Sequence, residues 1–307
     1  MESLNRMALE LVDEAIDFAS ELHVGVEELD GGATVLDFGL DHPGGHEAGL
    51  LLAKIQSAGL ASTDTHIESF DGRPRTHVET STDHPAVALL CSAAASWQLS
   101  VDGFEGLGSG PARALVAAEG IYDRVGYRDT AEFAVLTVET DERPTPAVAA
   151  EVADACGVPT ESVFLVAYPS ASVAGAVATA ARTAELSAVR LTELGYDPVD
   201  LLTVTGQAPI PPVPADERTA MARGSDATAH AGRAHLTVAE PFDRIDGIVS
   251  TASEPFATHY EEADDGDDSV LDPALFGPAV ATVDVVGGGT VAVGERRPSI
   301  AATGFGL

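Results

Sequence analysis

Apolar residues recur at helical spacing at the start of the chain. Within residues 1–23 they form one stripe, made of Leu4, Met7, Leu11, Ala15 and Leu22, and this pattern predicts an amphipathic helix. The stretch has no basic start and no apolar run, so it is not typical of a secretory signal. No run of 18 consecutive apolar residues follows. We therefore expect no membrane span and a cytoplasmic location.

Short β-rich segments flank glycine-containing turns at three places in the chain. Residues 24–40, 65–81 and 279–295 each contain two such segments around a turn, a pattern typical of β-hairpins. The sequence therefore predicts hairpins near both ends of the chain.

The middle of the chain alternates between helical and strand patterns. We predict helices over residues 83–97 and 144–157, with Gly157 ending the second. Residues 131–140 and 162–169 predict strands, the latter apolar throughout and suited to a buried position. One long helix is expected over residues 170–194.

These elements predict an α+β protein of two mixed sheet-and-helix domains with a cleft between them. We expect residues 1–80 and 270–307 to form the first domain, and residues 81–269 to form a second domain inserted between them. A length of 307 residues, 45% of them hydrophobic, is enough for substantial packed cores.

Charge narrows the range of partners. The chain has 49 acidic and 16 basic residues, a net charge of −33, and Lys54 is its only lysine. Such a surface repels nucleic-acid phosphates and anionic lipids, so we expect neither as a partner. In molar salt the Debye length falls to about 3 Å, which screens the self-repulsion. We therefore predict a salt-adapted protein from a cell with high internal salt.

The possible metal ligands do not form a convincing site. His42 and His46 are four residues apart, but the intervening Pro-Gly-Gly favours a turn over a zinc site. The acidic stretch 259–272 resembles a calcium loop but lacks its final glutamate, so a solvated loop is the better interpretation. Cys91 and Cys156 are too few for a disulfide framework. No metal is expected.

Glycines and a proline precede a helical pattern in residues 106–120. Pro111 suits the first helical position, so the backbone N–H groups around Ser109 and Gly110 would lie at the positive end of a helix, with Arg113 in its first turn. This arrangement could bind an anion. An ordinary capped helix with an exposed arginine fits the stretch equally well.

Two further stretches combine small residues with polar ones. Residues 205–213 read as a rigid proline-containing loop in which Gly206 and Gln207 could contact a ligand, although a plain connector also fits. In residues 178–188, Arg182 and Glu185 are three apart and share a helix face. An exposed ion pair is the ordinary interpretation of that spacing. The surrounding alanines instead favour close packing of this helix. An ion pair on such a closely packed helix indicates a functional role for Arg182 and Glu185.

Together these phrases resemble the methenyltetrahydromethanopterin cyclohydrolases of archaeal one-carbon metabolism. The resemblance runs nearly end to end and rests on six phrases in order, namely GGHEAGLL, TDHPAV with Trp97-Gln98 downstream, GSGPARAL, P-x-AS-x-x-G followed by R-x-x-E, TG-x-API-x-PV, and the closing GFGL. It implies hydrolysis of the cyclic amidinium of N5,N10-methenyl-tetrahydromethanopterin to the N5-formyl form.

The resemblance also assigns roles. It implies that Arg182 and Glu185 are the active-site pair, with Glu185 activating a water and Arg182 orienting Glu185. The phosphate-bearing tail of methanopterin-type carriers makes Ser109, Gly110 and Arg113 candidates for binding substrate, alongside Gly206 and Gln207. It implies no metal and no redox cofactor. It also implies a homo-oligomer, for which a trimer is common in the family.

One position departs from the family pattern. Ala94 stands where relatives have a lysine, three residues before Trp97. Salt adaptation explains the loss, or the carrier has a less anionic, folate-type tail. The second explanation would keep the reaction and change the substrate. A pterin-binding protein without catalysis is a further alternative, but it has no need of Glu185.

Overall fold

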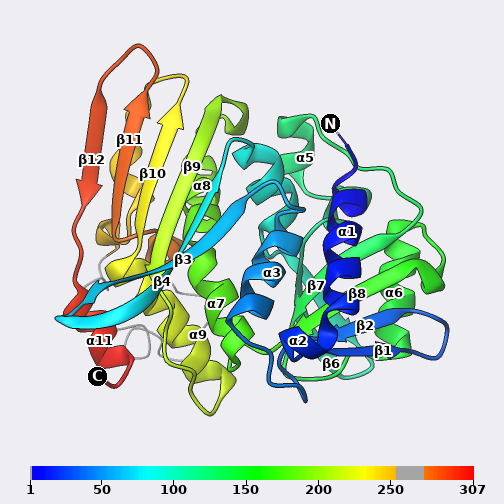
Figure 1. The fold of residues 1–307 in the computed structure, drawn as a ribbon. Helices are drawn as coiled ribbons and strands as arrows, with labels where there is room; N and C mark the ends of the chain where they lie inside the picture. Colours follow the sequence, from blue (N-terminus) through cyan, green and yellow to red (C-terminus); the bar gives the residue numbers. More distant parts are fainter. Residues whose placement is uncertain (1, 254–272) are drawn as a thin grey trace. The chain divides into compact units, whose positions relative to one another are not determined.

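The computed structural model describes residues 2–253 and 273–307, which divide into two compact units (Figure 1). Unit 1 comprises Met1–Ala61 and Val87–Ala178, and unit 2 comprises Ser62–Ala86 and Thr179–Leu307. Each unit contains a six-stranded mixed sheet and helices within the described part of the chain, so the expected α+β class is confirmed.

The sheet of unit 1 has the order β1-β2-β8-β7-β6-β5. Its strands are β1 (Gly25–Glu28), β2 (Thr34–Asp37), β5 (Trp97–Val101), β6 (Phe104–Ser109), β7 (Ala134–Glu139) and β8 (Val163–Tyr168). β8 pairs in parallel with β2 and with β7, and antiparallel hairpins extend the sheet at both ends. The expected hairpin in residues 24–40 is therefore confirmed, as is the buried strand in residues 162–169.

Helices cover both faces of the unit 1 sheet. They are α1 (Leu4–Asp17), α2 (Ala19–Leu22), α3 (His46–Gln56), η1 (Ala86–Ala93), α4 (Ala112–Val116), α5 (Gly120–Val125), α6 (Pro146–Cys156), η2 (Thr160–Ser162) and α7 (Val173–Ala181). Of the expected helix in residues 83–97, Ala86–Ala93 is helical, as the π-helix η1, and Trp97 begins strand β5. α6 ends at Gly157, whose φ of 69° is the left-handed conformation that favours glycine.

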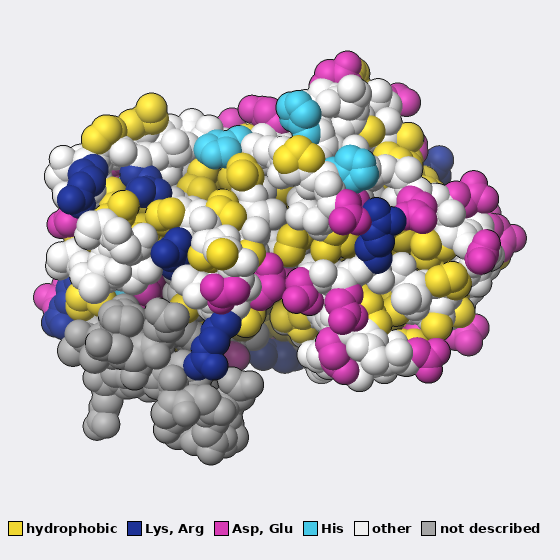
Figure 2. All heavy atoms as spheres, turned by 90° about the horizontal axis from the view of Figure 1, so that it is seen from below, with side chains coloured by type: hydrophobic (Ala, Val, Ile, Leu, Met, Phe, Trp, Pro, Cys, Tyr) yellow, Lys and Arg dark blue, Asp and Glu magenta, His cyan; other side chains and the backbone are white. Residues whose placement is uncertain are grey.

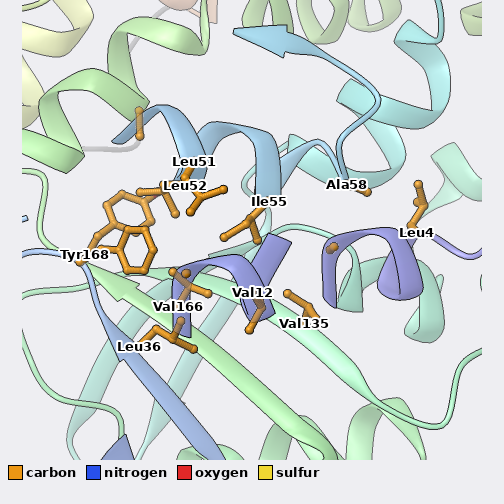
Figure 3. Packing of buried hydrophobic residues seen from close by; sticks show 14 of the residues in the cluster. Leu4, Val12, Leu36, Leu51, Leu52, Ile55, Ala58, Val135, Val166 and Tyr168 are labelled. Atoms are coloured by element: carbon orange, nitrogen blue, oxygen red, sulfur yellow. The ribbon is translucent and has the colours of Figure 1, made fainter. Parts of the chain in front are cut away.

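The core of unit 1 follows from the alternation of side chains along the central strands. Leu36, Val135 and Val166 point to the face covered by α1 and α3, whereas their neighbours Val35, Leu136 and Leu165 point to the face covered by α6. Figure 3 shows the first of these layers, with side chains of α1 and α3 packed against the strands. Complete burial of one such aliphatic side chain stabilises the fold by about 1.5–3 kcal/mol.

The sheet of unit 2 has the order β12-β11-β10-β9-β4-β3. Its strands are β3 (Ser62–Phe70), β4 (Arg73–Thr82), β9 (Leu201–Pro209), β10 (Arg233–Val238), β11 (Val280–Val285) and β12 (Thr290–Gly294). β3 and β4 form the expected hairpin of residues 65–81, and β11 and β12 form that of residues 279–295. The only parallel pair among these strands is β10 with β11.

The helices of unit 2 include a long one that packs against the sheet. They are α8 (Thr183–Glu193), η3 (Pro198–Asp200), α9 (Glu217–Asp226), η4 (Ala227–Ala231), η5 (Ile245–Ile248), η6 (Ser250–Ala252), η8 (Pro273–Phe276) and α11 (Pro298–Gly304). α8 packs against β9, β10 and β4. It therefore lies on one face of the sheet, at the strand that carries Gly206.

The division into units differs from the expected one of 1–80 with 270–307 and 81–269. The hairpin β3–β4 pairs with β9, so it joins unit 2, whereas residues 87–178 supply most of the unit 1 sheet. The pattern of a single strand does not specify its distant partner, which is why the boundaries were misplaced. The acidic stretch 259–272 lies outside the described residues.

The expected single helix of residues 170–194 is two helices, α7 and α8, separated at Arg182. The backbone N–H of Arg182 donates to the carbonyl of Thr179, three residues earlier, at 3.2 Å instead of to the residue four earlier. This tighter turn interrupts the α-helical hydrogen-bond pattern. The interruption places Arg182 directly before the first turn of α8.

Candidate active site

Arg182 and Glu185 form the ion pair that the sequence indicates. Nε of Arg182 donates to Oε2 of Glu185 at 2.9 Å. The side chain of Arg182 is 25% exposed and that of Glu185 only 5%. The pair therefore differs from an ordinary surface ion pair, in which both side chains are exposed. Removing a carboxylate from water costs on the order of several kcal/mol in a protein, so burial of Glu185 calls for an explanation.

The helix break determines how the pair is presented. Arg182 is the N-cap residue of α8, and Glu185 lies in the first turn of that helix. Unpaired backbone N–H groups at a helix start carry partial positive charge, which stabilises a nearby carboxylate. Within the described residues, Oε1 of Glu185 makes no hydrogen bond. The arrangement holds one carboxylate oxygen and leaves the other to interact with a reactant.

Gly206 supports the first turn of α8 from the sheet. It lies inside β9 and not in the loop expected for residues 205–213, because β9 pairs with β4 on one side and β10 on the other. A Cβ at position 206 would lie 2.6 Å from Cα of Ala184. Only glycine permits this approach, so the structure gives Gly206 a packing role next to Glu185.

Gln207 points to the opposite face of the sheet, since successive side chains of a strand alternate. Its Nε2 donates to Oε2 of Glu68 at 2.9 Å and lies 2.8 Å from Nε2 of His66. Its Oε1 accepts from Arg233 at 3.1 Å. The expected substrate contact of Gln207 stays a prediction, and its side chain belongs to a polar network on β3, β9 and β10.

Ser109 and Gly110 are buried in unit 1 and form hydrogen bonds with neighbouring residues there. Oγ of Ser109 lies 2.7 Å from Oγ1 of Thr137, and Nε2 of Gln56 is 3.4 Å away. The N–H of Gly110 donates to the carbonyl of Ser92 at 2.8 Å. α4 begins nearby, at Ala112, and has five residues. Substrate binding by these residues stays a prediction.

Arg113 is almost completely buried. Its guanidinium donates to both carboxylate oxygens of Glu119 at 2.8 and 2.9 Å and to the carbonyl of Ser92 at 3.0 Å. It also reaches the carbonyl of Leu90 at 3.4 Å. These contacts favour a structural role for Arg113. Anion binding by Arg113, which the sequence suggests, stays a prediction.

The candidate residues therefore fall into two groups. Arg182, Glu185, Gly206 and Gln207 belong to unit 2, where the first three lie around the start of α8. Ser109, Gly110 and Arg113 belong to unit 1. The expected cleft between domains stays a prediction.

His42 and His46 have different surroundings in the structure. Nδ1 of His42 lies 2.9 Å from Oδ2 of Asp37, and His46 begins α3. In residues 2–253 and 273–307, no group of three or more His, Cys, Asp or Glu side chains is placed to hold a metal ion. Cys91 and Cys156 are free thiols. None of the described helices is both long and apolar enough to cross a membrane.

The partners of Gln207 were not among the residues singled out from the sequence. His66 and Glu68 alternate along β3, so they share a face, and Arg233 is the first residue of β10. Alternation alone could have placed His66 and Glu68 together. Their pairing with Gln207 and Arg233 depends on strand order, which local patterns do not contain.

Comparison with known proteins identifies the family of the chain. A sequence profile of the family described as "Cyclohydrolase (MCH)" matches residues 3–305 of this chain. The methenyltetrahydromethanopterin cyclohydrolase of Halobacterium salinarum is 55% identical, with 100% of each chain covered. Those of Methanocella arvoryzae and Methanospirillum hungatei are 35% and 34% identical, covering 100% of this chain and 99% of each relative. The chain therefore belongs to the cyclohydrolase (MCH) family.

Proposed function

We propose that this chain hydrolyses the cyclic amidinium of N5,N10-methenyl-tetrahydromethanopterin to the N5-formyl form. The observation that carries the proposal is the buried Arg182–Glu185 pair at the start of α8. The relatives that bear the name of this activity cover the whole chain. The expected function is therefore supported both by the family and by the chemistry of the pair.

Glu185 is the group suited to act on water. The bridging carbon of the amidinium is already electrophilic, so the reaction needs a positioned water whose proton is removed as its oxygen attacks. The carbon–N10 bond then breaks as one of the two water protons passes to N10. The new hydroxyl loses the other proton to become the formyl oxygen on N5, so one proton is released overall. A carboxylate at this place also stabilises the positive charge of the bound substrate.

Arg182 positions the carboxylate. Its Nε holds Oε2 of Glu185, which fixes the plane of the carboxylate and directs Oε1 toward a reactant. Because the pair sits on one helical turn, its geometry is set by the backbone of α8. We assign Arg182 the role of orienting Glu185.

We propose that the reaction proceeds without a metal or redox cofactor, since the substrate carbon needs no further activation. We also propose that the enzyme is a cytoplasmic homo-oligomer, with a trimer as the form to test first. Turnover that survives dialysis against a chelator would support the first proposal, and turnover restored by a metal would oppose it. Light scattering in about 2 M KCl, a salt level that screens surface charge, would give the subunit number.

A folate-type carrier is the second candidate substrate. Ala94 stands where the family resemblance leads us to expect a lysine, and loss of that charge fits a less anionic tail. The reaction and the roles of Arg182 and Glu185 would be the same.

The test is the decay of methenyl absorbance with each of the two carriers in about 2–3 M KCl, where surface charge is screened. Glu185→Gln should lower kcat by about 10²–10⁴, the usual contribution of a general base. Glu193→Gln is the matched control, because Arg190 and Glu193 have the same spacing on the same helix but Glu193 is half-exposed. The carrier whose decay is accelerated is the substrate.

Two results would contradict the proposal. Near-normal turnover by a folded Glu185→Gln variant would remove Glu185 from the mechanism. Wild-type protein that binds either pterin without accelerating its decay would favour a non-catalytic pterin-binding protein.

A further inference from the structure

The sheet of unit 2 carries a basic cluster on the face opposite α8. Gly206 faces α8, so Gln207 and its partners project from the other face. We define the Glu68 cluster as Glu68 on β3, Gln207 on β9, Arg233 on β10, and Arg296, which follows β12 in the chain. Nothing in the proposed hydrolysis uses these four side chains together.

Glu68 is the carboxylate that pairs with both arginines, and Glu79, opposite Gln207 on β4, faces the same side of the sheet. Glu68 accepts hydrogen bonds from Arg233 and, at 2.9 Å, from Nε2 of Gln207. NH1 of Arg296 lies 3.7 Å from its other oxygen. Two guanidinium groups therefore share one carboxylate.

The positive charge of the cluster is only partly balanced. Burial lowers the pKa of Arg296, and the positive charge of nearby Arg233 lowers this pKa further. Nε of Arg296 is buried and has no hydrogen-bond partner among the described residues. An arginine with an unsatisfied donor beside a second arginine is a poor arrangement for stability alone.

This local excess stands out against the charge of the whole chain. Only 16 residues are basic against 49 acidic ones, so paired arginines with a single shared carboxylate are unexpected by composition. Figure 2 shows one face of the molecule, on which several dark blue Lys and Arg side chains lie among the magenta acidic ones. A positive region on such a surface attracts and holds anions.

We propose that the Glu68 cluster binds an oxyanion of the phosphate or carboxylate class between Arg233 and Arg296. Guanidinium groups bind such anions through paired N–H donors, a geometry that chloride cannot match even in molar salt. Both arginines are accessible, with side chains 37% and 26% exposed. Glu68 holds Arg233 in place and weakens anion binding by its own charge.

Two kinds of molecule could supply such an oxyanion, and both would present the same chemical group to the arginines. It is either a free anion such as inorganic phosphate, or the acidic tail of the pterin substrate. The second source rests on the proposed function, whereas binding of inorganic phosphate does not. The two can therefore fail separately.

The first experiment titrates the whole protein with inorganic phosphate in about 2 M KCl, a level that screens long-range attraction, and follows binding by calorimetry. Arg233→Gln and Arg296→Gln should each raise Kd about tenfold or more, the usual effect of losing a charge-assisted hydrogen bond. Arg297→Gln is the matched control, since this neighbour pairs with Glu295 on the exposed surface and its loss should leave Kd unchanged.

Glu68→Gln distinguishes an anion-binding cluster from one with a purely structural role. Removal of the carboxylate frees both guanidinium groups, so phosphate should bind more tightly than to wild type. Arg296 makes a single long ion pair with Glu68, so Arg296→Gln keeps the test valid even if Arg233→Gln unfolds. Circular dichroism in the same salt checks each fold.

Three outcomes would overturn the proposal. These are no phosphate binding by wild type, equal weakening by Arg297→Gln, or weaker binding by a folded Glu68→Gln variant. If phosphate binds as expected, the source follows from KM values for a methenyl pterin with and without its acidic tail. A rise in KM for the tailed substrate alone in Arg296→Gln identifies the tail, and unchanged KM values identify a free anion.

Discussion

Gly206 and Ala184 are so close that a Cβ atom on residue 206 would lie 2.2 Å from the backbone nitrogen of Ala184. Ala184 directly precedes Glu185 in the first turn of α8. The separation between strand β9 and this turn is therefore set by the absence of a side chain. The position of the Glu185 carboxylate depends on that separation.

Gly206→Ala should displace the first turn of α8 and lower kcat about tenfold or more, because small misplacements of catalytic groups are costly. The overpacked site should also lose about 1–3 kcal/mol of stability. Gly289→Ala is the control, since a Cβ there meets nothing within 4 Å. An unchanged kcat for Gly206→Ala would show that the close contact between β9 and α8 does not position Glu185.

Arg182→Gln should lower kcat by about 10–100-fold, because the carboxylate of Glu185 loses the hydrogen bond that orients it. Steady-state kinetics should show little change in KM, since Arg182 acts through Glu185. Arg190→Gln removes the other i,i+3 pair of α8 and should leave kcat unchanged. An equal fall of kcat in both variants would indicate a general effect on the helix.

Arg113→Ala should destabilise unit 1 and leave KM unchanged. Its removal takes the guanidinium donors from the carbonyls of Leu90 and Ser92, of which Ser92 keeps its bond from Gly110, and leaves the partly exposed Glu119 without its partner. We expect a loss of about 1–3 kcal/mol. Denaturant unfolding measures the first effect and steady-state kinetics the second. A raised KM with normal stability would instead restore Arg113 to the substrate site.

Asp37 should make stability fall in acid. Burial alone would raise its pKa, but hydrogen bonds from His42 and from the backbone of Gly39, Asp41 and Leu40 outweigh burial and lower it. The ionised form thus stabilises the fold fully above the ordinary carboxyl range, near about pH 4. This contribution is lost as the pH falls through the lowered pKa of the folded state.

The Asp37 prediction is tested by unfolding free energies at about pH 7 and pH 3, on either side of the ordinary carboxyl range. Asp37→Asn should be less stable than wild type at the higher pH, and the difference should shrink at the lower. Asp41→Asn is the control, because Asp41 pairs with Arg143 on the exposed surface. A stability difference that does not change with pH would contradict the assignment.

Dilution of salt should unfold or destabilise the protein. At about 0.1 M KCl the Debye length grows to about 10 Å, so the net charge of −33 is no longer screened. Circular dichroism should show a lower melting temperature at 0.1 M than at 3 M KCl, concentrations chosen to span that change in screening. The same fold and melting temperature in both would contradict salt adaptation.

The sequence by itself determined the features that depend on neighbours along the chain. Three hairpins, the end of α6 at Gly157 and the pairing of Arg182 with Glu185 all depend on residues a few positions apart. Turn residues and helical spacing act locally, so their signals are present in any short stretch. The ordered phrases added the family, which the comparisons confirm.

Only the tertiary structure decided which distant segments meet. The pairing of β4 with β9 moved the β3–β4 hairpin into unit 2 and placed Gly206 in a strand instead of a loop. It also buried Arg113 among carbonyls and brought Glu68, Gln207 and Arg233 together. The free energy of these contacts comes from packing between residues far apart in the chain, and no local pattern specifies such a partner.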